Sequence, residues 1–170
     1  MNSALLAILI LLLAVVVAQD FKDRAISWFL IPLLFIGFIA NGLLQIHPLE
    51  LLTYFGINFM LVAVNLLCVT LFISMKEKRI TNILKNYLGL GDVLFFLVLT
   101  VVFSPFNFIF FYLGSIFLTT LVYGVLQLIS KEKQRLIPLA GVMSLLLLVT
   151  IVAEQLIPSF QFYQDLILNS

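Results

Sequence analysis

Two aspartates are the residues of this chain best suited to do chemistry in an apolar setting. Asp20 follows an apolar run that starts at Met1, and Asp92 interrupts an otherwise uncharged stretch over residues 88–129. An ionisable side chain at membrane depth costs at least ~2.5 kcal/mol, so it is rarely present without a use. Two carboxyl groups that share a site hold one proton between them, so one activates water while the other donates to a carbonyl oxygen. The pair predicts peptide hydrolysis by two aspartates.

The composition places that chemistry in a lipid bilayer. Of 170 residues, 64% are hydrophobic and only 10% are charged, and the mean hydropathy is +1.24. A water-soluble core of this size does not need so many apolar residues. The net charge of +1 gives no argument for a nucleic-acid partner. The single cysteine, Cys68, excludes a disulfide framework or a cysteine-rich zinc site within one chain.

Stretches of about 20 apolar residues, the length that a helix needs to cross ~30 Å of hydrocarbon, divide the chain into six spans. The uncharged run over residues 88–129 is twice that length and must fold back once. Ser104-Pro105-Phe106-Asn107 supplies the turn, because proline lacks a backbone donor and Ser and Asn favour local turns. The sequence predicts a single all-α membrane domain over residues 1–170, with transmembrane helices at about 1–18, 28–46, 51–75, 88–104, 108–129 and 137–156.

The basic residues predict the orientation of these spans. All nine lysines and arginines fall in the loops after the first, third and fifth helices, and the alternate loops and both termini carry none. Basic loops stay on the cytoplasmic side of a membrane. We therefore expect a multi-pass protein of a bacterial or archaeal cell membrane, with both termini non-cytoplasmic. The residues concerned are Lys22, Arg24, Lys76, Lys78, Arg79, Lys85, Lys131, Lys133 and Arg135.

This topology puts both aspartates at the same membrane face. We expect the first and fourth helices to pack near each other at their cytoplasmic ends, with Asp20 and Asp92 pointing into the bundle. Gly89 and Gly91 directly precede Asp92, and their missing side chains let a substrate backbone approach it. Simpler roles are open for both carboxylates. Asp20 could close its helix beside nearby basic residues, and Asp92 could cap the start of its helix.

Three segments resemble a known family. Asp20-Phe21-Lys22-Asp23-Arg24-Ala25-Ile26-Ser27 is similar to the first aspartate motif of the type IV prepilin peptidases. Gly89-Leu90-Gly91-Asp92 matches the GxGD motif that these enzymes share with the preflagellin peptidases and other intramembrane aspartyl proteases. Lys133-Gln134-Arg135-Leu136-Ile137-Pro138-Leu139-Ala140 is similar to the segment that opens the last helix of the family. Leu94 stands where the family commonly has lysine, and Ser27-Trp28 replaces its usual Pro-Asn.

The resemblance implies an intramembrane aspartyl endopeptidase of the short form, without a methyltransferase region. It implies Asp20 and Asp92 as the catalytic pair and prepilin- or pseudopilin-like membrane proteins as substrates, cleaved at the cytoplasmic face. No metal or organic cofactor is expected. Two other classes of function stay open: a small ion- or proton-coupled transporter that uses the two aspartates, and a catalytically silent relative that acts in pilus or secretion assembly.

Overall fold

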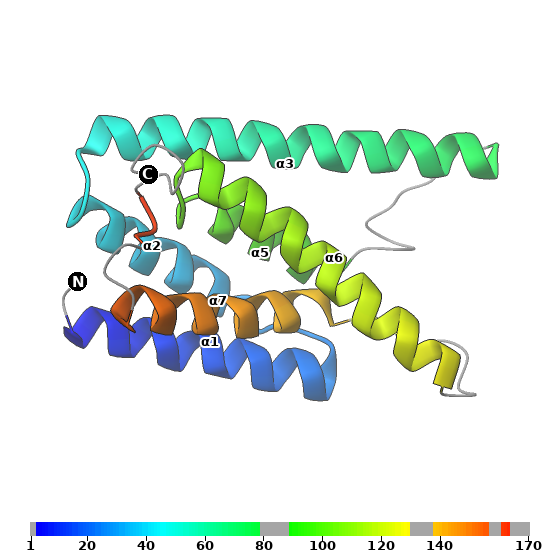
Figure 1. Cartoon of the computed structure of the whole chain (residues 1–170), viewed down its shortest axis with the longest axis horizontal. Coiled ribbons are helices and arrows are strands. Elements are labelled where there is room, and N and C mark those ends of the chain that lie inside the picture. Colours follow the sequence, from blue (N-terminus) through cyan, green and yellow to red (C-terminus); the bar gives the residue numbers. More distant parts are fainter. Residues whose placement is uncertain (1–2, 79–88, 130–137, 157–160, 164–170) are drawn as a thin grey trace.

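A computed structural model of the chain describes residues 3–78, 89–129, 138–156 and 161–163, with the backbone alone at 126–129. All regular structure in these ranges is helical, as the sequence predicts, and the helices pack side by side in a bundle (Figure 1). The six helices of the described ranges are α1 (Ser3–Asp23), α2 (Leu30–Leu43), α3 (Pro48–Glu77), α5 (Leu90–Leu99), α6 (Pro105–Ile129) and α7 (Leu139–Leu156).

Four of these helices are long and apolar enough to cross a membrane: α1, α3, α6 over Pro105–Val125, and α7. The other two, α2 with 14 residues and α5 with 10, are shorter apolar helices. At 1.5 Å per residue α5 is only about 15 Å long, half the thickness of the hydrocarbon layer. Many large apolar side chains are exposed on the outside of the bundle, above all along α3. The chain is therefore a multi-pass helical membrane protein.

The helix α5 ends well before the limit of 104 that the apolar pattern suggests. A turn over Thr100–Ser104 replaces its last residues, and the side chain of Asn58 on α3 bonds two of the carbonyls that this turn exposes. Asn58 Nδ2 donates to the carbonyl oxygens of Thr100 (3.0 Å) and Phe103 (2.9 Å). A partner on another helix thus fixes the end of α5, so the local sequence gives no sign of it.

Proline and a histidine cap set the starts of two long helices. Pro105 is the first residue of α6, a position where the missing N–H of proline costs nothing because the first turn has no intrahelical acceptor. Pro48 likewise follows the N-cap His47, whose Nδ1 accepts the N–H of Leu49 at 3.3 Å. The fold-back therefore lies over residues 100–104, just ahead of the Ser104–Asn107 turn expected from the sequence, because Pro105 starts the helix.

The order of packing differs from the sequence expectation at one point. α1 packs most extensively against α7, which lies beside it in Figure 1, and next against α2, whereas α5 packs mainly against α2 and α7. Contacts of both helices with α7 thus bring the ends of α1 and α5 that carry the aspartates toward each other. Small and apolar residues on α7 allow its close approach to α1: Ala140, Gly141, Met143, Ser144 and Leu147 are all buried.

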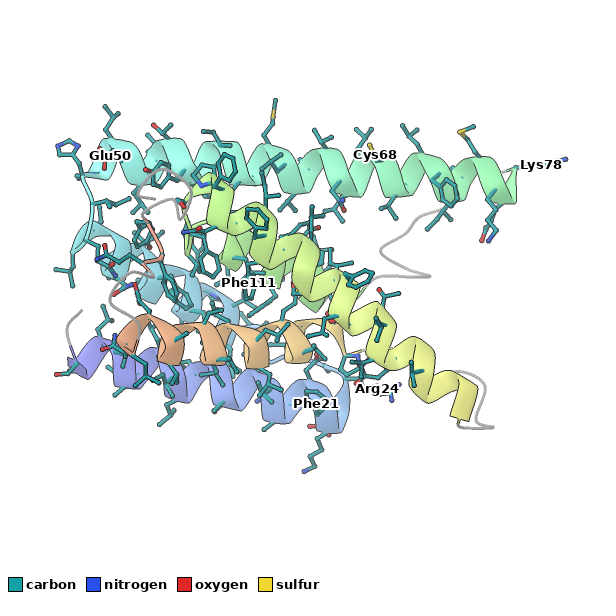
Figure 2. All side chains as sticks on the ribbon, in the orientation of Figure 1. Phe21, Arg24, Glu50, Cys68, Lys78 and Phe111 are labelled. Atoms are coloured by element: carbon teal, nitrogen blue, oxygen red, sulfur yellow. The ribbon has the colours of Figure 1, made fainter. Side chains whose placement is uncertain are left out.

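The described basic residues gather at one end of the bundle. Lys22 and Arg24 close α1 and Lys76 and Lys78 close α3, and Figure 2 shows Arg24 and Lys78 toward the same end, with Glu50 at the opposite end. The expected loop residues from Arg79 to Lys85 and from Lys131 to Arg135 lie outside the described residues. The start of α7, where both aspartates are found, lies at this basic end (Figure 1).

Candidate active site

Asp20 lies in the last turn of α1 and is buried, with 5% of its surface exposed. Its Oδ2 accepts the backbone N–H of Gly141 at 2.5 Å. The helix ends at Asp23, and the next residue, Arg24, adopts a left-handed conformation with φ of 51° and donates its N–H to the carbonyl oxygen of Asp20 at 3.1 Å. Arg24 also interacts electrostatically with the Asp20 carboxylate. The side chain of Asp20 therefore connects the end of α1 to the start of α7.

Asp92 lies in the first turn of α5 and is half-buried. Its Oδ2 accepts the N–H of Gly89, the N-cap residue of its own helix, at 3.3 Å. Its Oδ1 accepts the N–H of Ala140 at 2.9 Å. Asp92 thus caps the start of α5, which is the simpler role predicted for it from the sequence, and it also accepts a hydrogen bond from α7. It interacts electrostatically with Asp20.

The first turn of α7 is the element that brings the two aspartates together. The first backbone N–H groups of a helix have no acceptor within it, and the helix dipole favours negative charge there. Two successive residues, Ala140 and Gly141, each donate to one aspartate. Nitrogens of successive residues are at most about 3.6 Å apart, so the two accepting oxygens are at most about 9 Å apart. The structure therefore brings both sequence-predicted carboxylates to one place.

The two glycines ahead of Asp92 have different surroundings. A Cβ on Gly89 would lie 3.1 Å from Oδ2 of Asp92, so glycine at this position lets the carboxylate fold back onto the N-cap. A Cβ on Gly91 would lie 3.4 Å from Cδ1 of Ile26, in the connection between α1 and α2. Ile26 thus packs against one side of Gly91 in this structure.

A polar contact holds the connection between α1 and α2 in place. The backbone N–H of Ser27 donates to Oε1 of Gln19 at 2.9 Å. This bond ties the residue after Ile26 back to the turn of α1 that carries Asp20. The first aspartate motif therefore contributes both a carboxylate and an apolar side chain that covers part of the GxGD motif.

Three residues near the pair carry no assignment from the sequence. Ala140 and Gly141 contribute backbone N–H groups, which leave no mark in the side-chain pattern; the sequence signal nearest to them is the segment over residues 133–140 described above. Tyr123 on α6 interacts electrostatically with both Asp20 and Arg24, which brings a phenol to the same neighbourhood. A lone tyrosine in an apolar helix gives no such sign.

The chemistry available at this site is that of two carboxyl groups beside backbone donors. Among the described residues, no group of three or more His, Cys, Asp or Glu side chains could hold a metal ion. Asp23, the nearest other acid in the sequence, is exposed at the end of α1. The site thus presents two oxygen acids, each fixed through one oxygen by α7.

Comparison with known proteins gives one match. The model of the type IV leader peptidase family matches residues 7–125. Both aspartates and the GxGD motif fall inside the matched region, whereas α7 lies beyond it. Neither the comparison with curated proteins nor that with solved structures gave a match.

Proposed function

The chain belongs to the type IV leader peptidase family, and on that premise we propose that it is an intramembrane aspartyl endopeptidase with Asp20 and Asp92 as its catalytic pair. One observation carries the proposal: two carboxylates that are 72 positions apart in numbering accept hydrogen bonds from successive residues, Ala140 and Gly141, of one helix. Two acids that interact electrostatically can act as one unit when a bridging water or a small movement lets them share a proton.

The reaction needs only that pair and a water molecule. The ionised carboxylate takes a proton from water, whose oxygen attacks the carbonyl carbon of the scissile peptide, while the protonated partner donates to the carbonyl oxygen. The tetrahedral intermediate then collapses as the peptide C–N bond breaks. The leaving nitrogen takes the proton that came from water, and the intermediate's hydroxyl returns its own, so the pair again holds one proton.

We propose that the substrate is a prepilin- or pseudopilin-like membrane protein with a short basic leader ahead of an apolar helix. The family supports this class of substrate in general terms. The distribution of basic residues along the sequence supports six membrane segments with both termini outward and the aspartate pair at the cytoplasmic face. The leader and the scissile bond then meet the pair at the membrane boundary.

A structural role for the aspartates is the alternative that the test must separate. Both carboxylates satisfy N–H groups at the start of α7, so they could serve only to hold that helix. Asparagine keeps an oxygen that accepts the same hydrogen bond but cannot exchange a proton as a carboxyl group does. Asn substitutions therefore preserve the structural role and remove the catalytic one.

The test is cleavage of a prepilin-like substrate by the purified chain in detergent, with the products identified by mass spectrometry. The unmodified chain should cut between the basic leader and the apolar helix. Asp20→Asn and Asp92→Asn should each lower the rate about 10³-fold or more, because general acid–base catalysis is lost. Circular dichroism and thermal unfolding should show both variants folded.

Asp23→Asn is the matched control. Asp23 is exposed and lies on the same helix three residues after Asp20, so the same change of charge there should leave the rate within about twofold. Substantial cleavage by Asp20→Asn or by Asp92→Asn would show that the substituted residue is not part of the catalytic pair. A folded wild-type chain that cuts no such substrate would contradict the peptidase function and favour the transport or assembly alternatives.

A further inference from the structure

The start of α7 bonds both aspartates through its backbone. α7 packs along α1 through its buried residues, and it also contacts α5 and α6. Its first turn is bonded by side chains of two of these helices, Asp20 of α1 and Asp92 of α5. Because each carboxylate bonds a different N–H of that turn, the spacing between the two acids is set by the backbone of α7.

A side chain on residue 141 would force neighbouring atoms of α1 to move. A Cβ there would lie 2.9 Å from Oδ2 of Asp20, 3.1 Å from its Cβ and 3.1 Å from Cδ2 of Phe21. Figure 2 shows Phe21 at the end of α1, next to the start of α7. A Cβ at this position would push against the atom that accepts the Gly141 N–H. The short contact between α1 and α7 thus depends on glycine.

We propose that Ala140 and Gly141 are positioning residues for the aspartate pair, and that Gly141 must be glycine so that its N–H can hold Asp20 within reach of Asp92. The inference rests on the proposed function for its catalytic meaning, but the hydrogen bonds themselves can be tested without catalysis. It extends the site beyond residues 7–125, which contain both acids, to a helix that supplies only backbone groups.

The first test is the kinetics of Gly141→Ala on a prepilin-like substrate in detergent. The added methyl group should displace the Asp20 carboxylate and lower kcat about 10-fold to 100-fold, as a misplacement of about 1 Å does. KM should stay within about twofold of the wild-type value, because the change displaces a catalytic group and does not alter the contacts that bind the apolar helix of the substrate. An unchanged kcat in a folded Gly141→Ala chain would overturn the proposal.

Gly37→Ala is the matched control for crowding. A Cβ on Gly37 would lie 2.8 Å from Cδ2 of Leu9, so it presses on α1 from α2 as closely as one on Gly141 does from α7. Leu9 is buried in the apolar core, eleven positions before Asp20 on the same helix. This variant should unfold at a lower temperature than wild type while kcat stays within about twofold. An equal loss of kcat in both variants would mean that general packing strain, not positioning, explains the effect.

The second test measures hydrogen exchange of the two amides by NMR and needs no substrate. Both N–H groups should be protected in the wild-type chain, although first-turn amides lack a helical acceptor. In Asp20→Ala the Gly141 amide should exchange about 10-fold to 100-fold faster while the Ala140 amide keeps its protection. Asp92→Ala should give the reverse pattern. Exchange does not depend on position 141 being substituted, so it decides the matter even if Gly141→Ala does not fold.

The outcomes separate this inference from the proposed function. Amides at 140 and 141 that exchange freely in the wild-type chain, or that respond together to either substitution, would overturn the positioning role. A chain that shows the expected exchange pattern but cuts no substrate would refute the peptidase function while leaving the arrangement of α7 and the two acids intact.

Discussion

Two regions of this bundle bury polar groups at the end of a helix, one at a C-terminus and one at an N-terminus, and the side chains that bond them differ in chemistry. At the turn between α5 and α6, the helix end exposes carbonyl oxygens, and donors bond them: Asn58 Nδ2 reaches Thr100 and Phe103, and the Tyr163 hydroxyl reaches Val101 at 3.0 Å. At the start of α7 the helix exposes N–H groups, and the two carboxylates bond them. Each region satisfies its free backbone groups.

The difference lies in what the partner side chains can do beyond that bond. The amide and the phenol that donate to these carbonyls do not ionise near neutral pH, so they cannot act as an acid or a base. The α5–α6 turn is therefore a structural region. A carboxylate that accepts N–H groups can still gain and lose a proton, and this holds for Asp20, bonded through Oδ2, and for Asp92, bonded through both oxygens. Buried polar contacts alone therefore do not mark a functional site in this protein. The candidate site proposed here rests instead on two ionisable groups that interact with each other.

The largest difference between the two regions should be that they lie on opposite sides of the membrane. After Cys68→Ser, a cysteine in place of Gln45, in the connection between α2 and α3, should react completely with an impermeant thiol reagent added to intact cells. A cysteine in place of Lys76, near the end of α3, should not react until the cells are opened. Basic loops stay in the cytoplasm, which is the reason for this asymmetry. Labelling of position 76 in intact cells would reverse the orientation.

A smaller effect should follow from removing a donor at the α5–α6 turn. Asn58→Ala leaves the carbonyls of Thr100 and Phe103 without their partner and opens space in the core. The free energy of unfolding should fall by about 1–3 kcal/mol, as for other lost buried hydrogen bonds. The folded fraction should keep its kcat within about twofold. Thermal unfolding and cleavage assays on one preparation measure both quantities, and a loss of kcat larger than the loss of folded protein would join this turn to the site.

The sequence predicted the helices well because apolar runs of membrane length are strong signals. α3 and α6 start three residues before the predicted positions 51 and 108, at Pro48 and Pro105, because proline fits the first turn of a helix. The end of α5 did not follow, because the residues after Leu99 stay apolar and the turn is fixed by Asn58 from another helix. Interactions between distant segments set such boundaries, and a single sequence does not record them.

The candidate site was predictable only for its side chains. Asp20 and Asp92 stand out because a charge in an apolar run is costly. The groups that join them are backbone N–H groups of Ala140 and Gly141, which every helix start has, and only packing shows which start is used. Ile26 beside Gly91 was hidden for the same reason: an isoleucine in a connection gives no sign of the glycine that it covers.

The measurement that tests the central claim most directly uses a double variant that carries both Asp20→Asn and Asp92→Asn. Its rate of cleavage is compared with the rate of each single variant. Single-turnover cleavage with enzyme in excess gives residual rates even for slow variants. Residues that act as one unit are not additive, so the double variant should cleave at the rate of the slower single variant, within about threefold. Losses that multiply, giving a double variant about 10³-fold slower than either single one, would mean that Asp20 and Asp92 act independently.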